Sequence, residues 1–341
     1  LSAGGDDTGF GNSGEFWGES ADLRRRPFAD KFLQCSLFIN QLAALSVFTG
    51  LRLPLTQSAS QRLKVIIDAD TANEIDDLYA IVRALYAPEL EILGLSSAQW
   101  NNRLSPPDTV LQSQRINEDL LRLSGRQDIP CPMGSEMIFG KPWGGTDPRD
   151  SAAAQLMIRT ARLMKPGEKL TIICLGAVTN LASAIALAPD ILPKISCFIL
   201  SGKFFADRKV WDKEEFNLRN DLNAANYLFN CDGLDLTVMP INILYEFKFD
   251  QVDTLKRLSG KGALWDYLGA RWLTNAPSNT TRIFWDLALV EAVLRPAMFS
   301  VGSFTTPPEN KQRMINVYTS INIAAVTDDF WKTVERAQAR K

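Results

Sequence analysis

The chain of 341 residues contains no histidine, and this absence excludes several kinds of chemistry at once. Without an imidazole there is no Ser-His-Asp or Cys-His catalytic group, no histidine-based zinc site and no histidine acid or base. Any catalysis in this chain therefore depends on carboxylates, amides, hydroxyls, lysines or aromatic rings.

Cysteine and an excess of charge are also lacking. The five cysteines are odd in number and show no C-x-x-C spacing, which argues against a disulfide framework. Lysine and arginine number 37 against 39 acidic residues, a net charge of −2. Because no basic excess is available to neutralise phosphates, we expect no nucleic acid partner.

The first sixty residues differ in composition from the rest of the chain. Residues 1–31 are rich in Gly, Ser and Asp and are predicted to be disordered. Three arginines at 24–26 then precede a stretch without charge at 32–51, and small residues follow at 58–60. This order is typical of a secretory leader, so we expect a periplasmic or secreted protein. An amphipathic helix or a membrane anchor is the alternative, and without a leader the protein is cytoplasmic.

From residue 61 onward, apolar runs alternate with segments of helical periodicity. Strands are predicted at 64–70, 91–98, 170–175, 195–200 and 236–239, with a strand pair within 314–326, and helices at 75–85, 109–123, 151–164, 178–187 and 223–229. This alternation predicts one α/β domain over 61–341, with a Rossmann-like, open, mostly parallel sheet flanked by helices. In such folds ligands bind beyond the carboxyl ends of the strands.

An acidic cluster stands where the first predicted strand ends. Residues 68–77 (DADTANEIDD) contain four aspartates and one glutamate. Capping of the next helix by Asn73, with Asp76 in its first turn, accounts for only part of this set. Carboxylates so crowded repel one another unless a cation neutralises them, and ligands that are all oxygen suit Ca²⁺ or Mg²⁺. The cluster therefore predicts a metal site.

Other polar groups follow later strands or open later helices. They are 94–102 (GLSSAQWNN), 175–181 (LGAVTNL), 214–217 (EEFN) and 285–286 (WD). Each has an ordinary explanation when taken alone, such as a helix cap at Asp286 or a solvated acidic turn at 214–217. Their order along the chain is more specific than any single group.

Taken together and in this order, these residues resemble the inosine–uridine-preferring nucleoside hydrolase family over about residues 63–300. The cluster matches the family's D-x-D…D-D motif, with a turn two residues longer here, and 175–182 matches its G-x-x-T-N-L-A turn. Single residues match its ribose-binding Asn, its sugar-binding E-F-N and its last metal aspartate; these are Asn101, Glu215-Phe216-Asn217 and Asp286.

The resemblance implies an N-ribohydrolase that cleaves a ribonucleoside or related riboside into ribose and free base with a Ca²⁺-bound water. It implies that Ca²⁺ is bound by Asp70, Asp77, Asp286 and the Leu175 carbonyl, and that Asp68 supports these ligands from behind. It also implies that Asp76 is the general base and that Asn101, Glu215 and Asn217 bind ribose. The family commonly forms dimers or tetramers, so the resemblance also implies a homodimer or homotetramer.

The chain departs from the family pattern at two positions. Trp285 stands where familiar members have a histidine that helps the base to depart, and Lys209 replaces an Asn that usually lies six residues before E-F-N. An indole cannot donate a proton at neutral pH, but its face can stack on a base, so we expect Trp285 to bind substrate. The alternative is a Trp285 that turns inward and fills the core.

Two other functions fit parts of the pattern. A non-catalytic nucleoside- or sugar-binding protein on the same scaffold would explain the missing histidine, although it has no use for a base at Asp76. A haloacid-dehalogenase-type phosphatase also begins with D-x-D, but it requires Thr where this chain has Ala72. Release of reducing sugar from nucleosides separates hydrolysis from both.

Overall fold

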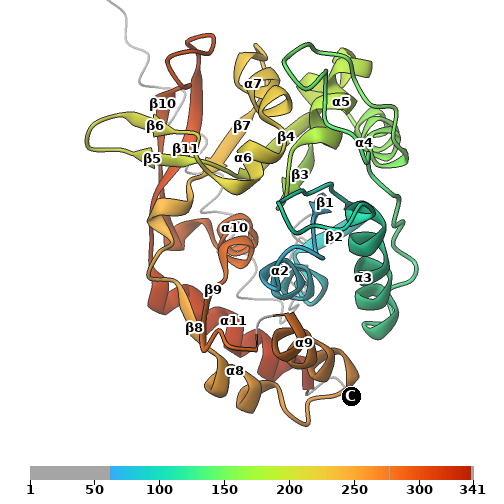
Figure 1. Ribbon diagram of the computed structural model, residues 1–341, viewed down its shortest axis with the longest axis vertical. Helices are drawn as coiled ribbons and strands as arrows, with labels where there is room; N and C mark the ends of the chain where they lie inside the picture. Colours follow the sequence, from blue (N-terminus) through green and yellow to red (C-terminus); the bar gives the residue numbers. More distant parts are fainter. Residues whose placement is uncertain (1–61, 276, 339–341) are drawn as a thin grey trace, which may run out of the picture. The chain divides into compact units, whose positions relative to one another are not determined.

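A computed structural model describes residues 62–275 and 277–338 (Figure 1). The predicted disordered segment and leader in residues 1–60 lie outside the described residues and stay predictions. Within these ranges, no helix is long and apolar enough to cross a membrane.

A seven-stranded sheet forms the centre of the fold, in the order β10-β11-β7-β4-β3-β1-β2. Every neighbouring pair is parallel except β10 with β11. The strands are β1 (Leu63–Ala69), β2 (Leu90–Ser97), β3 (Leu170–Cys174), β4 (Ile195–Leu200), β7 (Leu236–Met239), β10 (Phe299–Thr305) and β11 (Met314–Ile321). This arrangement confirms the predicted open, mostly parallel α/β sheet.

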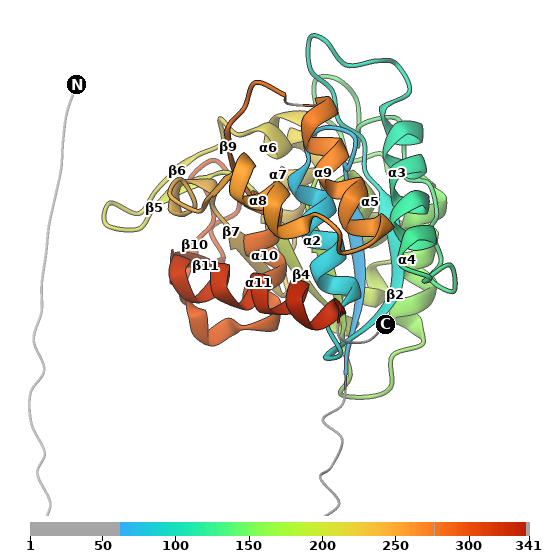
Figure 2. The same cartoon turned by 90° about the horizontal axis from the view of Figure 1, so that it is seen from below.

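Helices cover both faces of this sheet and bury two apolar clusters (Figures 1 and 2). One face carries α4 (Ala152–Arg162), α5 (Thr179–Leu187) and α7 (Leu222–Asn230). The other side carries α2 (Asp76–Leu85), α3 (Thr109–Leu123), α8 (Gln251–Leu258), α9 (Ala263–Asn275), α10 (Trp285–Leu294) and α11 (Ile323–Gln338). All five residues of β3 are buried, which explains why this central strand is mostly apolar instead of alternating.

The predicted strand pair within 314–326 is wrong. Only β11 lies there, because the chain enters α11 at Ile323, and the partner of β11 is the upstream strand β10. Most residues of β10 are exposed or half-buried, since it is an edge strand, so it has no apolar run to reveal it.

Short elements at the carboxyl side of the sheet were not predicted. They are the hairpins β5–β6 (Lys203–Phe205, Val210–Asp212) and β8–β9 (Lys248–Asp250, Thr281–Ile283) and the helix α6 (Phe216–Asn220). Strands of three residues are too short for periodicity to show. Lys209 lies in the β5–β6 turn with φ of 54°, a conformation that Asn or Gly adopts more readily than lysine.

Candidate active site

A cavity of about 210 Å³ lies where β1, β3, β4 and β7 reach their carboxyl ends. This is the edge at which the parallel sheet predicts a ligand. The cavity is lined by Asp70, Asn73, Glu74, Asp76, Asp77, Leu175, Leu200, Glu215, Phe216, Asn217, Ile241, Trp285 and Asp286. Eight of these residues belong to the predicted site.

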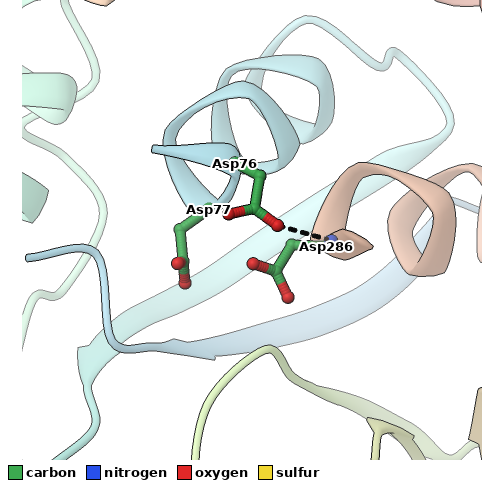
Figure 3. Close-up of side chains that lie close together, drawn as sticks. All are labelled: Asp76, Asp77 and Asp286. Atoms are coloured by element: carbon green, nitrogen blue, oxygen red, sulfur yellow. Dashed lines mark hydrogen bonds between the residues drawn. The ribbon is translucent and has the colours of Figure 1, made fainter. Parts of the chain in front are cut away.

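Three aspartates meet between the first turns of two helices (Figure 3). Asp76 and Asp77 open α2, Asp286 is the second residue of α10, and one carboxylate oxygen from each lies within 4.8 Å of the others. The amide N–H of Asp286 donates to Oδ2 of Asp76 at 3.2 Å. These helix starts place partial positive charge beside the three carboxylates.

Helix capping does not account for these acids. The residue before α2 is Ile75 and the residue before α10 is Phe284, and neither cap makes a side-chain hydrogen bond. The proposed cap at Asn73 is therefore wrong, as is the cap at Asp286. Both carboxyl groups of α2 and that of α10 face the cavity instead.

Asp70 reaches the cavity from the end of β1 and depends on a glycine beside it. A Cβ atom on Gly176 would lie 2.7 Å from Oδ1 of Asp70, closer than ordinary contact allows. Glycine at the end of β3 therefore leaves the space that the Asp70 carboxylate occupies.

Three oxygens of this group are buried and have no hydrogen-bond partner among the described residues: Oδ2 of Asp70, Oδ1 of Asp77 and Oδ1 of Asp286. Burial, and next the neighbouring carboxylates, raise the pKa of each of these side chains well above its ordinary value. Buried carboxylates without partners are costly, and a hard divalent cation supplies both the charge and the ligand bonds they lack. The donor set therefore fits Ca²⁺ or Mg²⁺.

Glu74 adds a further acid to the cavity wall. It belongs to the turn that is two residues longer than the family pattern, and it forms an ion pair with Arg282 of β9. Burial and then Asp76 raise the pKa of Glu74 to about 7, although Arg282 acts in the opposite direction. Glu74 is not among the site residues predicted from the sequence, although the longer turn that holds it was visible there.

The three E-F-N residues, Glu215, Phe216 and Asn217, line the cavity. The Glu215 carboxylate accepts hydrogen bonds from the backbone N–H groups of Asn217, Leu218 and Gly202, and it caps α6. The Asn217 amide donates to the carbonyl of Leu175 at 2.6 Å and to that of Leu200 at 3.1 Å. Asn217 thus fixes the orientation of the Leu175 carbonyl at the cavity.

Asp68 and Asn101 lie away from the cavity lining. Asp68 is fully buried and accepts hydrogen bonds from Ser96 at 2.6 Å and Asn180 at 3.0 Å, and burial raises its pKa to about 6. Asn101 is exposed, and its side-chain oxygen accepts a hydrogen bond from Ser105. It lines a separate surface hollow, so the structure does not bring it to the other predicted ribose-binding residues.

Trp285 lines the cavity beside Asp286 and is half-buried. Its ring packs edge to face against Tyr245, with centroids 6.0 Å apart and an interplanar angle of 83°. The alternative in which this indole fills the core is therefore wrong.

Ile241, just beyond β7, also lines the cavity but was not predicted as a site residue, although its place at a strand end was a usable signal.

The chain was compared with known proteins. The family model for inosine-uridine preferring nucleoside hydrolase matches residues 65–328. "Probable uridine nucleosidase 2" of Arabidopsis thaliana is 31% identical over 229 residues, which cover 61% of this chain and 68% of the relative. "Uridine nucleosidase 1" of the same plant is 32% identical, covering 58% of this chain and 62% of the relative. The chain thus spans about two thirds of the length of these relatives.

A solved structure shares the fold. The plant nucleoside hydrolase PpNRh1 superposes with a TM-score of 0.62 at 22% identity, covering 80% of this chain and 98% of that one. The match of the family model spans most of the chain and includes every residue that lines the cavity. The chain therefore belongs to the inosine-uridine preferring nucleoside hydrolase family, whose reaction is hydrolysis of the N-glycosidic bond of ribonucleosides.

Proposed function

We propose that this chain hydrolyses the N-glycosidic bond of a pyrimidine ribonucleoside such as uridine, with Ca²⁺ bound by Asp70, Asp77, Asp286 and the Leu175 carbonyl. The observation that carries the metal site is the set of three buried carboxylate oxygens, one on each aspartate, that have no hydrogen-bond partner within residues 62–275 and 277–338. The preference for uridine follows the names of the two plant relatives.

The chain's own residues divide the work of hydrolysis. Ca²⁺ held by Asp70, Asp77, Asp286 and the Leu175 carbonyl would supply a water of lowered pKa and a positive charge for the ribose hydroxyls. Asp76 removes a proton from the attacking water as general base, since its carboxylate faces the same cavity as the three ligand carboxylates. The water oxygen bonds to the anomeric carbon, the bond to the base nitrogen breaks, and the transition state resembles an oxocarbenium ion.

The remaining residues orient the substrate. Glu215 and Asn217 line the same cavity and bind the ribose hydroxyls. Trp285 presents its indole to the base and donates no proton, so the departing base takes its proton from water. Ribose binding by Asn101 and support of the metal aspartates by Asp68 stay predictions, as do a homodimer or homotetramer and export from the cytoplasm.

Release of reducing sugar from uridine, cytidine and inosine, with and without chelator, tests the proposal. We expect release from uridine that stops on chelation and returns with added Ca²⁺, and an Asp70→Asn variant that needs more Ca²⁺ for half-maximal rate. Binding of uridine without release would favour the non-catalytic alternative. Full activity in chelator would contradict the metal site.

A further inference from the structure

A buried ion pair joins the two helices that carry the site's aspartates. The guanidinium of Arg83 on α2 donates from Nε to Oε1 of Glu291 on α10 at 2.6 Å, and from Nη2 to Oε2 at 3.2 Å. The Arg83 side chain is 1% exposed and that of Glu291 is 0% exposed. Neither residue lines the active-site cavity.

This pair is one of two polar connections between α2 and α10, which pack side by side (Figure 1). The first is at the helix starts, where the Asp286 amide donates to Asp76. The second is the ion pair. Arg83 lies seven residues, or about two helical turns, after Asp76 on α2, and Glu291 lies five residues, or about one and a half turns, after Asp286 on α10. Two connections at different heights fix both the relative rotation and the relative height of the helices.

The apolar contacts between these helices do not fix their register as sharply. Hydrophobic packing is non-directional, and comparable side chains tolerate small shifts of one helix along the other. A planar guanidinium that forms two parallel hydrogen bonds with a carboxylate tolerates little displacement. Moving α10 relative to α2 separates Asp286 from Asp76 and Asp77, because these aspartates belong to the same two helices.

We infer that Arg83 and Glu291 are positioning residues for the metal site, holding the Asp77 carboxylate of α2 and the Asp286 carboxylate of α10 at the separation that a divalent cation needs. The inference rests on the metal site of the proposed function. Burying two charges carries a large desolvation cost, and replacing such a pair by apolar residues is often neutral or stabilising. Stability alone therefore does not account for the pair, whereas a fixed register of the helices does.

The network extends from the pair to α11. Arg83 also donates from Nη2 to Asp329 at 2.6 Å, and Asp329 lies 3.1 Å from Nε of Arg295. Asp329 therefore keeps a cationic partner when Arg83 is removed. The double variant Arg83→Met/Glu291→Leu consequently leaves no unpaired carboxylate in this network.

The test measures Ca²⁺ binding by calorimetry alongside thermal unfolding in chelator. For Arg83→Met/Glu291→Leu we expect an unfolding midpoint equal to or above that of the wild type. We expect its Ca²⁺ dissociation constant to be larger by about tenfold or more, as for other residues that support metal ligands. Arg83→Lys keeps the positive charge but cannot form two parallel hydrogen bonds with Glu291, so we expect an intermediate loss of Ca²⁺ affinity. The control is Lys64→Met/Glu168→Leu, which removes an ion pair away from both helices and should leave Ca²⁺ binding unchanged.

The outcomes separate this inference from the proposed function. Wild-type protein that binds no Ca²⁺ overturns the metal site itself. Wild-type binding that is equalled by the double variant overturns the positioning role alone. If the double variant does not fold, Arg83→Lys decides: unchanged affinity in that variant overturns the inference, and weaker affinity with an unchanged unfolding midpoint supports it.

Discussion

At the scale of single residues, the site contains more carboxylate side chains than the three proposed as metal ligands. Asp70, Asp77 and Asp286 each present a buried oxygen that has no partner in the part of the chain that the structure describes. One oxygen of Asp76, by contrast, accepts a hydrogen bond from the Asp286 amide. This difference separates the proposed ligands from the proposed base. A hydrogen bond that holds Asp76 in place leaves its other oxygen for the water.

Asp76→Asn keeps the shape of the side chain and removes its ability to take a proton. We expect turnover of uridine to fall by ~10²–10⁴-fold, with Ca²⁺ affinity within about tenfold of the wild type. Steady-state kinetics and calorimetry measure the two effects. Asp207→Asn, at an exposed position in the β5–β6 turn, is the control and should change neither. Loss of Ca²⁺ binding together with turnover would make Asp76 a ligand instead.

Trp285 is half-buried and lines the cavity, so its proposed contact with the base can be tested by substitution. Trp285→Phe keeps an aromatic face and should retain most activity, whereas Trp285→Ala should lose ~1–3 kcal/mol of base recognition, the scale of base–aromatic stacking. The loss should appear in kcat/KM for uridine and be smaller for a nitrophenyl riboside. Tyr245→Phe retains the ring that Trp285 packs against and serves as the control. Equal kcat/KM for Trp285→Ala and wild type would exclude stacking.

At the scale of elements, the cavity is built from the ends of strands and the starts of helices. Asp70 directly follows β1, Leu175 directly follows β3, and α2 and α10 bring their first turns to the same edge. Each functional group therefore depends on where one element ends. At one of these junctions Asp70 lies so close to Gly176 that a Cβ atom on residue 176 would be 2.7 Å from Oδ1 of Asp70.

Gly176→Ala should push the Asp70 carboxylate out of place. Its Cβ atom would lie within 3.0 Å of three Asp70 atoms, so we expect Ca²⁺ affinity to weaken by about tenfold or more while the sheet still forms. Calorimetry and circular dichroism check the two expectations. Gly269→Ala on α9 meets only the end of the Leu255 side chain and should leave Ca²⁺ binding intact. Unchanged affinity in Gly176→Ala would show that Asp70 is not held by this junction.

At the scale of the whole molecule, the site concentrates negative charge in a protein that is almost neutral. The net charge is −2, yet the cavity gathers Asp70, Glu74, Asp76, Asp77 and Asp286 in one place. Without a cation this concentration opposes folding whenever the carboxyl groups are ionised. Metal binding and pH are therefore linked to global stability.

The metal-free protein should become less stable as pH rises from about 4 to 7. The folded pKa values of Asp70, Asp77 and Asp286 lie above the ordinary 3.8, and those of Asp68 and Glu74 are about 6 and about 7. The folded state therefore binds more protons than the unfolded state in this range, and stability falls with rising pH. Acids whose folded pKa is lowered, such as Asp329, lose their contribution only at more acidic pH.

Ca²⁺ should remove most of this slope, because it stabilises the ionised carboxylates. Thermal unfolding midpoints at pH 5, 6, 7 and 8, with and without Ca²⁺, should diverge as pH rises. In Asp286→Asn the divergence should shrink. The same Ca²⁺-induced shift at pH 5 and at pH 8 would contradict the linkage.

Sequence patterns were sufficient for elements with a clear apolar run or a clear helical stripe. Helix α3 and strands β4 and β7 occupy the predicted residues, because runs buried on both faces and helical stripes are local signals. The edge strand β10 and the three-residue strands have no such signal, since their residues are mostly exposed or too few. The family resemblance, which depends on short motifs in a fixed order along the chain, is confirmed by the family model over residues 65–328.

The sequence by itself determined which side chains are available for chemistry. The absence of histidine, the acidic cluster at 68–77 and the E-F-N at 215–217 are properties of the chain, and they excluded imidazole catalysis and predicted a carboxylate site. Only the tertiary structure decided which of these groups meet. It brought Asp286 to Asp76 across 210 residues, left Asn101 in another hollow, and buried the pair of Arg83 with Glu291, because packing between distant helices is not encoded in local spacing.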